Sequence, residues 1–180
     1  MKGLILEETS SPPPAATHRW YGLRTKSKFE KVAAVSLAHK GYEHYLPCHR
    51  YRRRWSDRVT EVETPLFPGY LFCRFDVLKR LPILTTPGVV SVVGVGKQPL
   101  AIPDSEIAAV ETIVQSGLRA EPWPYLRQGQ RVRIEKGPLG GLEGIFIRGK
   151  SDEWSIVVSV NMLQRSVSVE IDRDWIHSVQ

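Results

Sequence analysis

Hydrophobic and polar positions near the start of the chain predict a strand, a tight turn and a helix. Residues 20–25 (WYGLRT) have the composition of a strand. Apolar and small residues then recur at helical spacing, at Phe29, Val32, Ala33, Ser36 and Leu37. Ser27 and Glu30 have the spacing of a capping box, in which each side chain bonds the backbone amide of the other. Gly41 is a helix stop.

The same pattern predicts further strands and a second long helix before residue 117. Residues 43–46 and 89–93 predict short strands, and residues 64–75 predict a longer one. A short helical or irregular segment follows that longer strand. Asp104 is placed to cap the second helix, which ends at Gly117. Its apolar face is formed by Ile107, Val110 and Val114. Strands that alternate with helices in this way predict an α+β domain.

The last fifty residues have a different pattern, with short β-rich segments separated by glycines. Residues 131–134 and 166–171 alternate between polar and apolar side chains, and residues 144–148 and 154–160 are rich in β-branched residues. Short strands joined by glycine turns predict a small antiparallel barrel. We therefore predict a disordered tail at 1–17, an α+β domain at 18–116, a linker at 117–128 and an all-β domain at 129–180.

Charge is concentrated in the first predicted domain. Residues 18–116 hold 15 Lys and Arg against 9 Asp and Glu, whereas residues 129–180 hold 7 of each. A basic excess indicates contact with nucleic acid or with an acidic protein surface. No apolar run is long enough to cross a bilayer, and the N-terminus does not resemble a signal peptide. We therefore expect a cytoplasmic protein in which Cys48 and Cys73 are free thiols.

Catalytic and metal-binding patterns do not account for any segment. Residues 137–144 (GPLGGLEG) are rich in glycine, but they lack the Gly-Lys-Ser/Thr of a phosphate-binding loop and lead into a strand. His44, Cys48 and His49 are close in sequence, but their spacing does not match a four-ligand zinc site. No serine, cysteine or histidine stands in a nucleophile motif. We predict a protein that is not an enzyme and that uses no cofactor or metal.

The segment 65–72 (PLFPGYLF) is apolar on both sides of the strand predicted there. Alternation places Phe67, Leu71, Cys73 and Phe75 on one face and Leu66, Pro68, Tyr70 and Phe72 on the other. The prolines place this strand at an edge, or at its own start. Two interpretations are open. Either the helices of the domain cover both faces, or one face is an exposed aromatic patch that receives a partner helix.

Residues 50–58 (RYRRRWSDR) form a basic segment with interleaved aromatic side chains. Arginine makes bidentate phosphate contacts, and Tyr51 and Trp55 can stack on unpaired bases. A solvated hairpin tip that carries charge against aggregation explains the same residues equally well. Lys26, Lys28 and Lys31 can extend the positive surface, although helix surfaces commonly carry lysine.

Several motifs, taken in order, resemble the NusG family of transcription elongation factors. They are Trp20-Tyr21, the helix that follows, PLFPGYLF at 65–72, Thr86-Pro87-Gly88-Val89 and GQRVRIEKGPLGGLEGIF at 129–146. The resemblance covers nearly all of residues 18–180. The segment WSDR before ETPLFPGYLF is most similar to the specialised RfaH and UpxY paralogues, which act as antiterminators.

The resemblance implies a NusG N-terminal α/β sandwich whose open apolar cavity receives the clamp helices of RNA polymerase. The residues that match polymerase-binding positions are Trp20, Tyr21, Phe67, Pro68, Gly69, Tyr70 and Leu71. Binding there suppresses pausing or termination in this family. The second domain resembles a KOW domain, an SH3-like barrel that contacts a ribosomal protein or Rho. We expect a monomer that does not bind membranes.

Nucleic acid, as non-template DNA or nascent RNA, is a further expected partner. The resemblance places Lys26, Lys28 and Thr86 near the DNA, and the basic segment adds Arg52, Arg53 and Arg54. Lys79-Arg80-Leu81 stands where RfaH-like proteins carry a His-Thr-Thr segment. Alternation at 166–171 predicts a stable barrel, unlike RfaH, whose second domain can refold into helices. The alternative function is an RNA-binding or ribosome-associated KOW module, but the neutral second domain does not favour it.

Overall fold

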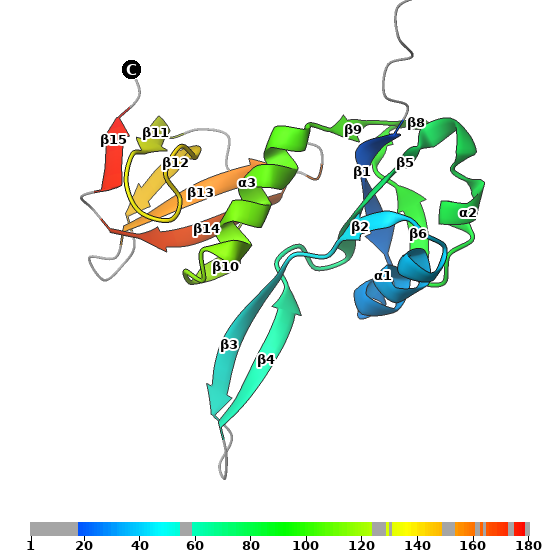
Figure 1. The fold of residues 1–180 in the computed structure, drawn as a ribbon, viewed down its shortest axis with the longest axis horizontal. Coiled ribbons are helices and arrows are strands. Elements are labelled where there is room, and N and C mark those ends of the chain that lie inside the picture. Colours follow the sequence, from blue (N-terminus) through cyan, green and yellow to red (C-terminus); the bar gives the residue numbers. More distant parts are fainter. Residues whose placement is uncertain are drawn as a thin grey trace, which may run out of the picture.

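Two antiparallel sheets lie on either side of a helix, α3, in a mixed α/β fold made mostly of strands (Figure 1). The computed structural model describes residues 18–54, 59–123, 129, 131–148, 154–160, 163, 165–172 and 175–178. The predicted tail at 1–17 and residues 55–58 of the basic segment lie outside the described residues. None of the helices in the described part of the chain has the length and apolarity needed to cross a membrane.

The first part of the chain contains all three α-helices of the described residues. Its elements are β1 His18–Thr25, α1 Glu30–His39, β2 Glu43–Tyr45, β3 Cys48–Arg54, β4 Val59–Pro65, β5 Tyr70–Asp76, a 3-10 turn η1 Val77–Lys79, α2 Leu81–Leu84, β6 Val89–Val92, β7 Gly94–Val95, β8 Gln98–Pro99, β9 Ala101–Ile102 and α3 Asp104–Gln115. The described elements that follow are all strands, namely β10 Ala120–Trp123, β11 Arg131–Ile134, β12 Glu143–Arg148, β13 Trp154–Val160, β14 Arg165–Ile171 and β15 Ile176–Ser178.

The first sheet has the strand order β2-β5-β1-β6, and β9 also pairs with β1. β1 and β5 run antiparallel through its centre, with Tyr21 opposite Cys73 and Leu23 opposite Leu71. Because side chains alternate along each strand, these residues share one face. α1 and α2 cover that face over a core of Tyr21, Leu23, Ala33, Leu37, Leu71, Cys73, Phe75 and Ile83.

The opposite face of the first sheet is covered by α3 and by the C-terminal part of the chain. A single continuous core joins these three layers. Its members from the first part include Trp20, Leu66, Phe67 and Phe72, those from α3 are Ile107, Val110 and Ile113, and those from the C-terminal part include Ile156, Val158, Leu163, Val167 and Val169. The two halves of the molecule therefore share apolar packing.

The second sheet has the strand order β10-β14-β13-β12-β11-β15, and each of these pairs is antiparallel. The strands predicted at 131–134, 144–148, 154–160 and 166–171 are confirmed. Within the range predicted as a linker, residues 120–123 form β10 and pair with β14.

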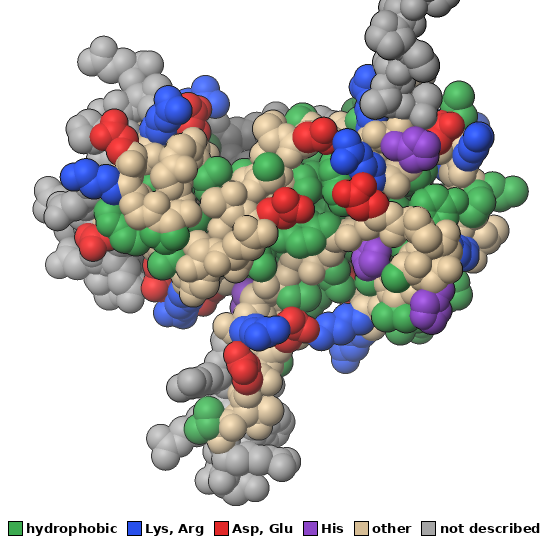
Figure 2. Space-filling view, viewed as in Figure 1, with side chains coloured by type: hydrophobic (Ala, Val, Ile, Leu, Met, Phe, Trp, Pro, Cys, Tyr) green, Lys and Arg blue, Asp and Glu red, His purple; other side chains and the backbone are tan. Residues whose placement is uncertain are grey.

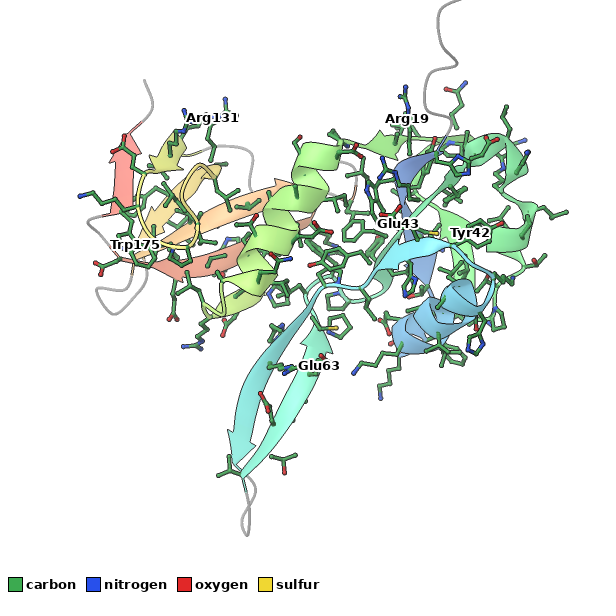
Figure 3. All side chains as sticks on the ribbon, in the orientation of Figure 1. Arg19, Tyr42, Glu43, Glu63, Arg131 and Trp175 are labelled. Carbon is green, nitrogen blue, oxygen red and sulfur yellow. The ribbon has the colours of Figure 1, made fainter. Side chains whose placement is uncertain are left out.

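β3 and β4 form a long two-stranded hairpin that projects from the body of the molecule (Figure 1). At its root, Lys31 Nζ lies 2.9 Å from Glu63 Oε2, and Arg50 Nε lies 3.6 Å from Glu63 Oε1. Figure 3 shows Glu63 on β4, close to where the hairpin leaves the body. The hydrogen bond from Lys31 lowers the pKa of Glu63. These exposed ion pairs add little stability, but they link the hairpin root to α1.

Candidate functional site

The segment 65–72 contains a tight turn rather than one unbroken strand. β4 ends at Pro65 and β5 begins at Tyr70. The Tyr70 amide donates to the Phe67 carbonyl at 3.0 Å, and Gly69 has φ of 82°. Proline followed by a glycine of positive φ is the pattern of a type II turn. The continuous strand predicted at 64–75 is therefore wrong, and the glycine is required by its backbone conformation.

The turn places the Phe67 side chain on the opposite side of the sheet from the side predicted. Phe67 packs edge-to-face on Phe72, with ring centroids 5.6 Å apart, instead of facing the Leu71 side. Tyr45 stacks on the same Phe72 ring at 6.3 Å. Trp20 joins this side from β1, and Gly22 lies next along the same face. We call Trp20, Gly22, Phe67, Tyr70 and Phe72 the aromatic face.

Glu30 holds the turn in place from α1. Its Oε1 accepts a hydrogen bond from the Gly69 amide at 2.8 Å, and the Gly69 carbonyl accepts one from the Thr25 amide at 2.8 Å. The predicted capping box is wrong, because α1 begins at Glu30 and Phe29 precedes it without a side-chain cap. The Asp104 cap is also wrong, because α3 begins at Asp104 itself after Pro103. The Glu30 carboxylate is buried and serves the turn instead.

Removing this carboxylate should destabilise the fold. We expect Glu30→Ala to lower the free energy of unfolding by about 1.5–3 kcal/mol, because the Gly69 amide would lose a charged acceptor. Denaturant unfolding of the full chain measures this change. Glu61→Ala, on the exposed side of β4, is the control and should change stability by less than about 0.5 kcal/mol. Equal effects of the two substitutions would contradict the role given to Glu30.

The predicted partner-binding residues divide between the two faces of the first sheet. Trp20, Phe67 and Tyr70 lie on the aromatic face, with Pro68 and Gly69 in the turn beside them. Tyr21 and Leu71 belong instead to the core beneath α1, on the opposite face of the sheet. Alternation from Trp20 and Tyr70 identifies Gly22 and Phe72, which were missing from the predicted set.

The aromatic face is covered in this structure, so the expected open cavity is wrong. Phe67 is 1% exposed and Leu163, from the C-terminal part, is 5% exposed. A Cβ atom placed on Gly22 would lie 2.6 Å from Leu163 Cδ2 and 3.2 Å from Val93 Cγ2. The guanidinium carbon of Arg165, at the start of β14, lies 5.8 Å from the centre of the Tyr70 ring. Figure 2 shows hydrophobic side chains where α3 meets the first sheet, with charged groups around them.

A buried hydroxyl marks the packing of α3 on this face. Burial raises the pKa of Tyr45, and the negative charge of Glu111 on α3 raises it further. The Tyr45 oxygen has no hydrogen-bond partner among the residues that the structure describes. An unsatisfied buried hydroxyl costs about 1–3 kcal/mol. The covered arrangement therefore contains a polar group that water would stabilise after exposure.

The predicted nucleic-acid contacts come from three segments of the chain, the turn after β1, the segment after α2 and β3. Lys26 and Lys28 are exposed in the turn between β1 and α1. Thr86 is 2% exposed, and its hydroxyl donates to the Pro82 carbonyl at 2.9 Å and accepts from Lys40 Nζ at 2.9 Å. The Thr86 side chain therefore makes internal contacts in this structure. The backbone of Arg52, Arg53 and Arg54 forms the end of β3, but their side chains lie outside the described part of the chain.

His44, Cys48 and His49 do not form a metal centre in the described residues. His44 lies on β2, and the other two lie on β3. Within the ranges that the structure describes, no group of three or more His, Cys, Asp or Glu side chains could hold a metal ion.

Comparisons with known proteins agree on one family. A family model described as NusG, transcription termination factor, matches residues 18–111. The NusG transcription termination/antitermination protein of Thermus thermophilus is 25% identical over 173 residues, covering 85% of this chain and 94% of that protein. The protein of the same name from Escherichia coli K12 is 25% identical over 177 residues, covering 88% and 94%.

A solved structure has a similar fold. It is reported as "Domain interaction in Thermotoga maritima NusG", with a TM-score of 0.56 and 20% identity over 91% of this chain and 98% of that chain. At this identity the likeness concerns the fold alone. Because the family model spans more than half of the sequence, the chain belongs to the NusG family of transcription termination and antitermination factors.

Proposed function

We propose that this protein is a transcription elongation or antitermination factor that binds the clamp helices of RNA polymerase through its aromatic face. Proteins of the NusG family are not enzymes, so the function lies in binding. The observation that carries the proposal is the aromatic face itself, where Trp20, Phe67 and Phe72 are packed by segments distant in sequence. A concentrated apolar and aromatic surface suits the apolar side of a partner helix.

Polymerase binding in this proposal requires the C-terminal part to leave the aromatic face. Leu163 and Arg165 lie where a partner helix would pack against Gly22 and Tyr70. A binding-competent state that is only partly populated lowers the apparent affinity by the same fraction. The covered form is therefore a resting state, and contact with polymerase competes with the internal packing.

The C-terminal part is the second functional unit in this proposal. Residues 129–180 form a KOW domain with an SH3-like barrel, separate from the polymerase-binding domain at 18–116. The order β14-β13-β12-β11-β15 of five antiparallel strands supports this assignment. Its seven basic and seven acidic residues in 129–180 favour recruitment of a protein, such as a ribosomal protein or Rho, over nucleic acid. The WSDR segment favours an RfaH- or UpxY-type antiterminator.

Transcription in vitro tests the proposed function. A template with one strong pause site and one terminator is transcribed by RNA polymerase with and without the full chain. We expect shorter pauses or more read-through in its presence, because a factor across the clamp holds it closed. Unchanged pausing and termination at saturating protein would contradict the proposal. Adding Rho separates suppression of termination from faster elongation.

RNA binding by the hairpin is the second candidate function, favoured by the arginine run on β3. We expect the triple change Arg52→Ser, Arg53→Ser and Arg54→Ser to reduce the salt dependence of binding to single-stranded nucleic acid. The slope of log affinity against log salt should fall by about 2, at roughly 0.7 for each phosphate that one of these arginines neutralises. Filter binding at four salt concentrations measures the slope. A slope equal to that of the unaltered chain would show that these arginines only solvate the hairpin.

A further inference from the structure

β10 adds a sixth strand to the C-terminal sheet from outside the predicted barrel. It pairs with β14 in antiparallel register, with Ala120 opposite Val169, Glu121 opposite Ser168 and Trp123 opposite Ser166. β10 stands at the end of the strand order, so β14 would be the edge strand without it. The chain thus covers one edge of its own barrel with a short segment between α3 and β11.

The hydrogen-bond pattern shows what the β14 edge presents. The Glu170 amide donates to the Arg119 carbonyl at 3.1 Å. Because antiparallel hydrogen bonds recur at alternate residues, Ser168 and Ser166 also direct their backbone polar groups toward β10. Pro122 pairs with Val167, which lies between these positions, so its missing N–H lies on the outer side of β10. Proline there prevents a further strand from adding to β10.

β10 is held by little apolar burial. Only Ala120 is buried, whereas Glu121, Pro122 and Trp123 are exposed. The segment 119–122 lines an open groove of about 1570 Å³ that also borders α1 and the root of β3. By contrast, Val167 and Val169 on β14 are fully buried. β14 is therefore anchored in the core by its buried side chains, whereas β10, which pairs with its edge, is mostly exposed.

Side chains near β10 indicate which residue types a strand needs in order to pair with the edge of β14. Arg119 Nη1 lies 3.1 Å from Glu170 Oε1, and Arg119 also pairs with Glu121. The buried Ala120 follows opposite Val169. A strand that matches this edge therefore carries a basic residue opposite Glu170 and a small residue next to it. Backbone donors and acceptors with an acidic group at one end suit a polypeptide rather than nucleic acid.

We propose that the edge of β14 is a docking site for an extended segment of a partner protein, occupied within this chain by β10. The partner segment adds antiparallel to β14 by backbone hydrogen bonds, with a basic residue at Glu170. This proposal deepens the recruiting role given above to the C-terminal part and rests on it. Release of β10 exposes the edge, so β10 and the partner compete for the same hydrogen bonds.

A labelled peptide tests the proposal on the full chain. The probe is a fluorescein-labelled peptide with the sequence of residues 117–123, GLRAEPW, followed by fluorescence anisotropy. The recipient is a variant in which β10 is disabled by Ala120→Gly, Glu121→Ser, Pro122→Gly and Trp123→Ser. We expect the peptide to bind this variant at least about 10-fold more tightly than the unaltered chain, where β10 already fills the edge. Cooperative thermal unfolding checks that the variant is folded.

Charge exchange provides the matched control. A peptide with Arg119→Glu should bind the variant at least about 5-fold more weakly, and adding Glu170→Arg to the variant should restore its binding. If the fourfold variant does not fold, the single substitution Arg119→Glu in the full chain replaces it, because it weakens β10 more mildly. The same labelled peptide is then titrated against this single variant. Absence of binding to a folded variant, or equal binding of matched and reversed peptides, would overturn the proposal. The assay contains no polymerase, so its failure would leave the polymerase proposal standing.

Discussion

Replacing Leu163 by aspartate is expected to raise the apparent affinity of the full chain for RNA polymerase by about tenfold or more. Leu163 is 5% exposed and packs against Gly22. A carboxylate there loses its hydration without gaining a partner, which disfavours the covered state. The open state, in which the aromatic face is free, becomes more populated. The apparent affinity for polymerase rises in proportion to that population.

Polymerase titration followed by native gel shift measures this effect. Acrylamide quenching of tryptophan fluorescence reports the exposure of Trp20 when it is compared with quenching of a Trp20→Phe chain, which retains the other four tryptophans. Leu163→Ser removes the apolar contact without adding a charge and should give an intermediate increase. Val95→Asp is the control, because Val95 is 73% exposed and lies outside both cores. If affinity stays at the unaltered level while quenching shows an exposed face, packing of Leu163 does not limit polymerase binding.

Adding Tyr70→Asp to the Leu163→Asp chain should then reduce polymerase binding by at least about 100-fold. In the open state Tyr70 lies on the surface of the aromatic face, and a partner helix would bury the new charge there. An unpaired buried charge costs several kcal/mol, and about 2.7 kcal/mol corresponds to 100-fold in affinity. Phe67→Asp is a poorer test, because Phe67 is 1% exposed and its loss would also weaken folding.

Co-elution with polymerase on size-exclusion chromatography measures the weakened binding, and thermal unfolding confirms that the double variant is folded. Leu78→Asp in the same background is the matched control, since Leu78 is 89% exposed on η1. Co-elution of the Tyr70→Asp variant at the level of this control would contradict the assignment of the aromatic face as the polymerase contact.

Local elements were predictable from the sequence because they depend on periodicity over a few residues. β1, α1 and β13 follow their hydrophobic patterns closely. The turn at Pro68-Gly69 was predictable in principle, since Pro-Gly is a strong type II signal. Its apolar surroundings instead favoured a continuous strand. This one turn moved Phe67 to the other side of the sheet, which shows how a local error changes a predicted surface.

The covering of the aromatic face was beyond the reach of sequence patterns. Alternation shows that a face is apolar, but it does not show which segment packs on it. Gly22 lies within the predicted strand at 20–25, but only the structure shows that Leu163 packs where its side chain would be. Glu30 had the spacing of a helix cap, yet its carboxylate bonds the Gly69 amide, a contact 39 residues away in sequence. Such long-range contacts depend on tertiary packing, which local propensity does not encode.

The sequence predicted a linker at 117–128, a range that includes Pro122 and Pro124. Pro122 instead occupies an outward-facing position of an edge strand, where a missing N–H is tolerated. The signal was present in the short apolar-polar pattern of residues 120–123, but a four-residue strand is too short to identify by periodicity.

A surface with two alternative occupants is subject to two selection pressures at once. Trp20, Phe67 and Phe72 must fit side chains of their own chain and, in the proposed function, those of a much larger assembly. Optimising the fit to either occupant shifts the balance between them. Mutations that stabilise the packing of this core would therefore reduce polymerase binding, and mildly destabilising ones would make the protein bind polymerase constitutively.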